Sequence, residues 1–165
     1  MKRRTRTLVL LAATAALLGA AVFAQLRHER AQAHDPLTDL DLAAVRTLIV
    51  DCQGCTPRRY EKVDGCWRMT APREQPADAA RIDRMLAIAH APVRFRHARG
   101  EIDPAKVGLA PPQATLQLDG TTLAFGATDA IHGDRYVAVG TTIALVPDRF
   151  SALLFAEEPG LGIGD

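Results

Sequence analysis

The sequence predicts an α+β domain, in which an antiparallel β-sheet built from hairpins carries helices on one face and follows one N-terminal transmembrane or signal helix. Three observations predict this class. Short turn-forming pairs separate extended runs at three places, apolar and polar residues alternate within those runs, and one segment has an apolar stripe at helical spacing. About 120 residues lie between the leader and a polar end, which is enough for one modest core.

Residues 1–26 are predicted to be a signal anchor or a signal peptide. Lys2 and three arginines form a basic start, and the 20 residues from Thr7 to Leu26 carry no charge. As a helix, such a run spans about 30 Å, the thickness of a bilayer's hydrocarbon core. The length favours an anchor, whereas Val22-Phe23-Ala24 has the small-residue pattern of a cleavage site, so both fates stay open.

Both fates place the following domain on the same side of the membrane. Since the basic start is expected to stay in the cytoplasm, residues 7–26 would cross the inner (cytoplasmic) membrane once, with the C-terminal domain in the periplasm or outside. A cleaved leader would release the domain into the periplasm. After Ala24 the chain has 16 basic and 19 acidic residues, a formal charge of 16 − 19 = −3. That balance gives no electrostatic footprint for nucleic acid, so none is expected as a partner.

The rest of the chain is predicted to contain a polar tether at 27–36, a single α+β domain of unknown function at 37–157 and a flexible tail at 158–165. The strands follow the turn signals Asp64-Gly65, Asp119-Gly120 and Gly140-Thr141. We expect seven or eight strands, each with one buried and one solvated face. They include residues 46–52, 58–63, 66–70, 93–97, 114–118, 121–126, 135–139 and 142–146.

Three helical segments are predicted. The clearest is residues 77–89, where Ile82, Met85, Leu86 and Ala89 form one apolar stripe before Pro92. A short helical turn is expected at 103–108, because Asp103 can cap it and Pro104 fits the first helical position. A last apolar helix is expected over residues 147–155.

An ordered series of motifs gives the chain a resemblance to a family. The segments are GCWRMTAP, PADAARIDRML, KVGLAPPQATLQL and FGATDAIHGDRYVAVG. In this order they resemble the family called domain of unknown function 4340, over about residues 40–147. The resemblance implies a membrane-tethered extracytoplasmic module. Some family members lie beside components of ABC-type export systems, and no catalytic residues are established for the family.

The resemblance also gives structural meaning to several positions. Trp67 would be a core anchor beside the helix, and Gly126 and Tyr136 would flank a loop at 127–134. Gly108, Pro111 and Pro112 would form a rigid turn that leads into the next strand. Solvated loops often carry function. The candidate partner-contact residues in this loop are Asp129, His132 and Asp134.

The stretch DCQGC and the later Cys66 admit several interpretations. In an exported domain thiols tend to pair, and a bond from Cys52 or Cys55 to Cys66 would close a loop of about a dozen residues, worth about 3 kcal/mol. Redox chemistry is the second interpretation: Arg58 and Arg59 could stabilise a thiolate, although no helix follows the motif. A zinc site, unpaired thiols and an intermolecular bond are the others.

These observations predict a protein without catalytic residues, metal or cofactor. The chain contains no nucleophile elbow, zinc-binding helix motif, phosphate loop or dinucleotide fingerprint. We expect a non-catalytic accessory or interaction module, with the inner membrane and membrane transport or envelope proteins as partners. The alternative is an extracytoplasmic thiol-redox or metal-binding protein that uses the three cysteines.

Overall fold

The computed structural model describes residues 18, 19, 21, 22, 35–98 and 100–156. The chain divides into two units after Asp35, and the sheet belongs to the unit that begins at Pro36. The predicted leader at 1–26 and tether at 27–36 lie largely outside the described residues, and the predicted tail at 158–165 lies wholly outside them. Within the described part of the chain, no helix is long and apolar enough to cross a membrane.

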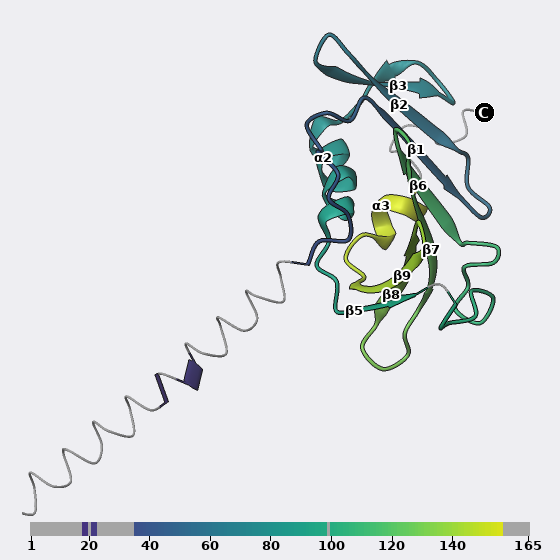
Figure 1. Cartoon of the computed structure of the whole chain (residues 1–165). Helices are drawn as coiled ribbons and strands as arrows, with labels where there is room; N and C mark the ends of the chain where they lie inside the picture. Colours follow the sequence, from purple (N-terminus) through teal and green to yellow (C-terminus); the bar gives the residue numbers. More distant parts are fainter. Residues whose placement is uncertain (1–17, 20, 23–34, 99, 157–165) are drawn as a thin grey trace, which may run out of the picture. The chain divides into compact units, whose positions relative to one another are not determined.

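One antiparallel sheet of nine strands forms the body of the described domain, in the order β4-β3-β2-β1-β6-β7-β8-β9-β5 (Figure 1). Two short α-helices accompany it in the unit that begins at Pro36, α2 (Ala79–Ala87) and α3 (Ser151–Phe155). The predicted hairpin-built sheet is therefore confirmed, but the fold is mostly β. The strands are β1 (Thr47–Cys52), β2 (Arg58–Val63), β3 (Cys66–Ala71), β4 (Gln75–Pro76), β5 (Phe95–Ala98), β6 (Ala114–Leu118), β7 (Thr121–Thr128), β8 (Asp134–Val139) and β9 (Thr142–Pro147).

The three predicted turns join β2 to β3, β6 to β7, and β8 to β9. Each contains a residue with positive φ: 51° at Asp64, 47° at Asp119 and 54° at Gly140. Aspartate and glycine tolerate this left-handed conformation better than other residues, which is why a two-residue sequence signal could locate the hairpins.

Helix α2 carries the chain from one edge of the sheet to the other, since β4 and β5 are consecutive strands at opposite edges (Figure 1). The Asp78 side chain caps the helix by accepting from the backbone N–H of Ala80 and Arg81. The whole predicted apolar stripe is buried, and its last member, Ala89, lies in the short 3-10 helix η1 (Ile88–His90) that follows. Strand β5 begins at Phe95, two residues later than predicted, because Val93 packs into the main core instead.

The main core lies between one face of the sheet and the helices. Side chains of β1, β2, β6 and β7 meet residues of α2 and α3 in a single buried cluster. Trp67, which the resemblance suggested as a core anchor, is only partly buried against it. Fully buried members include Leu48, Tyr60, Met85, Leu116, Phe125 and Leu154.

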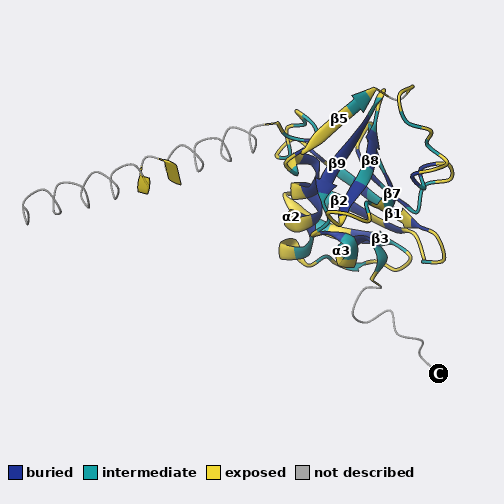
Figure 2. Cartoon of the chain, turned by 90° about the horizontal axis from the view of Figure 1, so that it is seen from below, coloured by how far each residue is buried: buried dark blue, intermediate teal, exposed yellow. Residues whose placement is uncertain are grey.

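The opposite face is also covered at β8 and β9. The turns of residues 100–113 place Val107 and Leu109 over Ala138 and Ile143, forming a second small cluster. Four consecutive residues of β9, Ile143 to Val146, are buried: Ala144 and Val146 face the main core, and Ile143 lies in the second cluster (Figure 2). The prediction of one solvated face for every strand is wrong here, because a segment without regular structure covers the outer face.

Candidate functional site

The structure joins Cys52 to Cys55 by a disulfide bond. Cys52 is the last residue of β1 and is 8% exposed, whereas Cys55 is partly exposed in the loop before β2. The Cys55 N–H donates to the Cys52 carbonyl at 3.2 Å, and Gly54 takes a φ of 78°. The backbone turn therefore holds the two residues with their Cα atoms 5.4 Å apart.

The predicted bond to Cys66 is not present, since Cys66 is an exposed free thiol. It opens β3, where it pairs with Val63 at the far end of β2. Six residues of extended chain separate the two ends of β2, a length of about 20 Å. Sequence separation alone suggested a suitable loop, but the β2–β3 hairpin carries Cys66 away from the other two cysteines.

Arg58 is a buried cation that shares a contact with Cys52. It lies opposite Val50 on β2 and is only 2% exposed. Its guanidinium donates to the Ala156 carbonyl at 2.8 Å and to the Leu154 carbonyl, at the end of α3. The Cys52 Sγ lies 3.4 Å from the same Leu154 oxygen. The sulfur and the guanidinium thus meet at one buried carbonyl.

A groove of about 190 Å³ opens beside the disulfide. One wall is Asp51, Cys52 and Gln53, at the end of β1. The opposite wall is formed by residues 112–115 at the start of β6. The Gln53 side chain crosses to donate to the Pro112 carbonyl at 3.0 Å. This groove brings solvent close to the buried sulfur.

A second groove, of about 290 Å³, lies between the end of α2 and the segment before α3. Arg84 and Arg149 flank apolar side chains that include Ile88, Phe150 and Leu153. None of its lining residues carries a carboxylate, thiol, hydroxyl or imidazole, so it offers no group for acid–base or nucleophilic chemistry.

Of the three residues predicted to contact a partner, Asp129 and His132 lie in the loop between β7 and β8, and Asp134 is the first residue of β8. The Asp129 carboxylate accepts from the backbone N–H of His132 at 2.9 Å and of Ile131 at 3.2 Å. The His132 N–H is the strongest of the contacts that lower the pKa of Asp129. Asp134 is buried and forms an ion pair with Arg94 at 3.1 Å. Asp129 and Asp134 therefore organise the loop, and His132 remains at its surface.

Two large apolar side chains are exposed, one in this loop and one on the edge strand β5. Ile131, at the loop tip, is 81% exposed, and Phe95, on the edge strand β5, is 59% exposed. The ion pair between Arg94 and Asp134 links the start of β5 to the end of the loop. Sequence reasoning singled out the polar residues of this loop and did not select Ile131 or Phe95.

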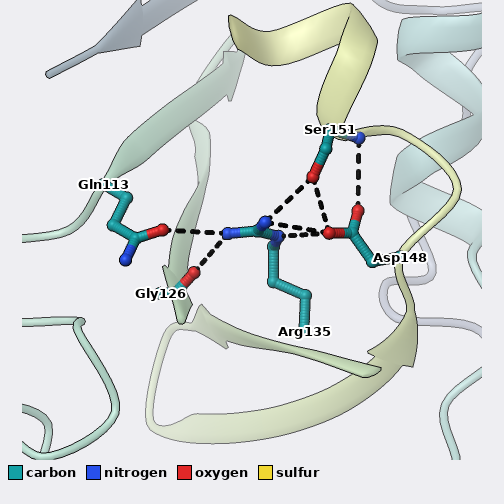
Figure 3. Close-up of polar contacts among 5 residues, drawn as sticks. All are labelled: Gln113, Gly126, Arg135, Asp148 and Ser151. Carbon is teal, nitrogen blue, oxygen red and sulfur yellow. Dashed lines mark hydrogen bonds and ion pairs between the residues drawn. The ribbon is translucent and has the colours of Figure 1, made fainter. Parts of the chain in front are cut away.

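Arg135 forms a buried polar network that sequence reasoning did not identify (Figure 3). Its guanidinium donates to Asp148 at 2.9 Å, to Gln113 at 3.0 Å and to Ser151 at 2.9 Å. It also donates to the Gly126 carbonyl. Side-chain alternation along β8 could have predicted that Arg135 is buried, because it lies on the same side of the strand as Val137, which faces the core. The network joins β7, β8 and the start of α3.

Among the residues that the structure describes, no three His, Cys, Asp or Glu side chains gather as a metal site. The described histidines contact other groups singly: His90 meets the Leu40 carbonyl at 2.8 Å, and His97 lies 3.5 Å from Glu101. His132 contacts Asp129 at 3.2 Å. The expectation of no cofactor stays a prediction.

No family model, curated protein or solved structure matches the chain. The resemblance to domain of unknown function 4340 consequently remains a prediction from the ordered motifs.

Proposed function

We propose that this protein is a non-catalytic, membrane-tethered extracytoplasmic interaction module, which works as an accessory of an envelope or ABC-type export complex. Residues 7–26 would hold it in the inner membrane. Support comes from the leader, in which a basic start precedes a long uncharged run, and from the motifs that resemble domain of unknown function 4340. The buried Arg135 also favours this role, since its guanidinium is hydrogen-bonded to Asp148, Gln113 and Ser151 within the fold.

The observation that carries the proposal is the exposure of two large apolar side chains, Ile131 in the β7–β8 loop and Phe95 on the edge strand β5. Large apolar side chains that project from a loop tip and an edge strand are suited to packing in a partner's pocket. An edge strand can also accept a further strand from a partner. His132 lies beside Ile131 and would contribute a polar contact at the rim.

The experiment is recovery of membrane transport subunits on the tagged full-length chain, extracted from its native membrane. Ile131→Asp and Phe95→Asp each place a charge in the proposed contact, and we expect about tenfold lower recovery of those subunits. Val63→Asp is the matched control, because Val63 is an exposed apolar residue, 47% accessible, at the distant β2–β3 hairpin. Equal recovery by all three variants, or the absence of transport subunits from the wild-type sample, contradicts the proposal.

The proposed topology has its own test. A tag fused at the C-terminus should be digested by protease added to cells with a permeabilised outer envelope and an intact inner membrane. A tag that stays protected until the inner membrane is dissolved contradicts the extracytoplasmic placement.

A further inference from the structure

We propose that the Cys52–Cys55 bond is a redox-active disulfide, which exchanges with an external dithiol through Cys55 while Arg58 stabilises the departing Cys52 thiolate. This activity is additional to the contact role and does not depend on it. Three features of the site carry the proposal: the short loop that the bond closes, the unequal exposure of its two sulfurs, and the buried cation at the inner sulfur.

The bond spans a sequence separation of only three. A loop this short restricts the unfolded chain little, so the bond contributes little as a staple. The β1 pairing with β6 and the Cys55-to-Cys52 backbone hydrogen bond hold both residues in place. The fold therefore keeps the two sulfurs close enough to re-form the bond after it is reduced.

The two sulfurs differ in their access to solvent. Cys55 is partly exposed in the loop, whereas Cys52 is 8% exposed under the end of α3. An incoming thiolate can therefore reach the Cys55 sulfur more readily than the Cys52 sulfur. Cys55 is consequently the sulfur that is attacked, and Cys52 is the leaving group.

Arg58 supplies the charge that stabilises the leaving group. Cys52 lies two residues after Val50, on the same side of β1, and Arg58 lies directly opposite Val50 on β2. The Cys52 and Arg58 side chains are therefore diagonal neighbours on one face of the sheet. Both reach the Leu154 carbonyl. A guanidinium at this position favours a Cys52 thiolate, which speeds its departure. In thiol oxidoreductases a helix N-terminus often stabilises the thiolate. Here no helix follows Cys52 and Cys55, and the arginine on β2 would supply the positive charge.

The external reductant would be a dithiol, such as a reduced protein dithiol. One thiolate of the reductant attacks the Cys55 Sγ, the Cys52–Cys55 bond breaks, and its electron pair goes to the Cys52 Sγ. The second thiol of the reductant then attacks its own mixed disulfide and releases the Cys55 thiolate. The domain gains two electrons and two protons, and the reductant becomes a disulfide.

The test uses the full-length chain in detergent with Cys66→Ser, so that only this pair reacts, and dithiothreitol as the dithiol probe. We expect the bond to be reduced and re-formed in the folded protein, with unchanged circular dichroism, as followed by alkylation and mass spectrometry. Reduction that occurs only in unfolding concentrations of urea, or that itself unfolds the domain, overturns the proposal.

Variants of Arg58 separate charge from packing. Arg58→Met should slow reduction by dithiothreitol about tenfold, and Arg58→Lys should restore most of the rate. The matched control is Arg81→Met, since Arg81 also donates to the Ala156 carbonyl, at 3.3 Å, from α2. Equal slowing in Arg58→Met and Arg81→Met overturns the role of Arg58.

Trapping identifies the attacked sulfur without relying on the arginine variants. With Cys66→Ser throughout, Cys52→Ser leaves only Cys55, and Cys55→Ser leaves only Cys52. Glutathione disulfide should form a mixed disulfide at least about tenfold faster with Cys55 than with Cys52. Equal rates, or faster reaction at Cys52, overturn the assignment.

Discussion

The two halves of the sheet bury their side chains in different ways. In β1 the residues alternate between buried and more exposed positions, and one face packs under the helices. In β9 four consecutive residues are buried: Ala144 and Val146 face the main core, and Ile143 lies in the second cluster, under residues 100–113. Alternation in sequence therefore reports burial only where one face of a strand meets solvent, and a covering loop removes that pattern.

Each half also contributes one buried arginine to α3. Arg135, on β8, binds Asp148 and Ser151 at the start of the helix, whereas Arg58, on β2, binds the Leu154 and Ala156 carbonyls at its end. A helix of five residues has little stability of its own. The position of α3 therefore depends on buried arginines from both halves of the sheet.

The largest effect is expected from Arg135→Met. Removing the guanidinium leaves the Asp148 carboxylate, which lies 2.8 Å from it, without its buried partner. We expect the free energy of unfolding to fall by about 3–5 kcal/mol. Urea unfolding measures it, with Arg149→Met, an exposed arginine of the same segment, as a control expected within about 0.5 kcal/mol of wild type. A loss below about 1 kcal/mol for Arg135→Met contradicts a structural role for the network.

An intermediate effect is expected from Gly126→Ala. A Cβ at this position would lie 2.2 Å from the Val107 carbonyl oxygen, so the covering segment would have to move away from β7. We expect a loss of about 2–3 kcal/mol in urea unfolding. Gly120→Ala is the matched control on the same strand pair, because its Cβ would meet nothing within 4 Å. Similar stabilities for the two variants would show that the cover is not closely packed on the sheet.

The smallest effect is expected at the β6–β7 turn. Desolvation acts to raise the pKa of Asp119, but hydrogen bonds from Thr47, by its side chain and its backbone, and from the Arg46 N–H outweigh it and lower the pKa. Because the folded pKa lies below the ordinary value of 3.8, the stabilisation is present above that pH and is lost as the pH falls through the folded value.

Asp119→Asn keeps a residue that tolerates positive φ and removes the charge. We expect a loss of about 0.5–1 kcal/mol at pH 7 and a smaller difference from wild type at pH 3. Unfolding curves at the two pH values measure this. Asp64→Asn, at the equivalent turn position with a φ of 51°, should change stability by less than about 0.5 kcal/mol. A loss for Asp119→Asn that is the same at both pH values would exclude the charged hydrogen bonds as its cause.

Local signals predicted much of the fold. The turn pairs at Asp64 and Asp119 located two hairpins, and the stripe from Ile82 to Ala89 located the α2–η1 segment, because these signals depend on neighbouring residues alone. The two-residue strand β4 was missed, since Gln75 and Pro76 carry no alternation and pair only through contact with β3. The final helix begins at Ser151, four residues later than predicted, because β9 extends to Pro147.

The candidate sites were predicted less well. The sequence identified Cys52 and Cys55 as a pair of interest and suggested that Arg58 or Arg59 could act on a thiol. Only the strand register separates the two arginines, since Arg58 is buried beside Cys52 and Arg59 is exposed. The loop at 127–134 was also selected, but whether its acids are free to bind a partner depends on contacts with residues such as Arg94, far away in the chain.

The hairpins and the α2–η1 segment with its buried stripe follow from short stretches of sequence, because turn geometry and side-chain periodicity are properties of neighbouring residues. Contacts between distant segments separate Cys66 from the other cysteines, cover β8 and β9 with a loop, and bind two arginines to α3. These arrangements depend on contacts between segments that are far apart in the chain, and the packing of the whole chain decides which of those contacts form.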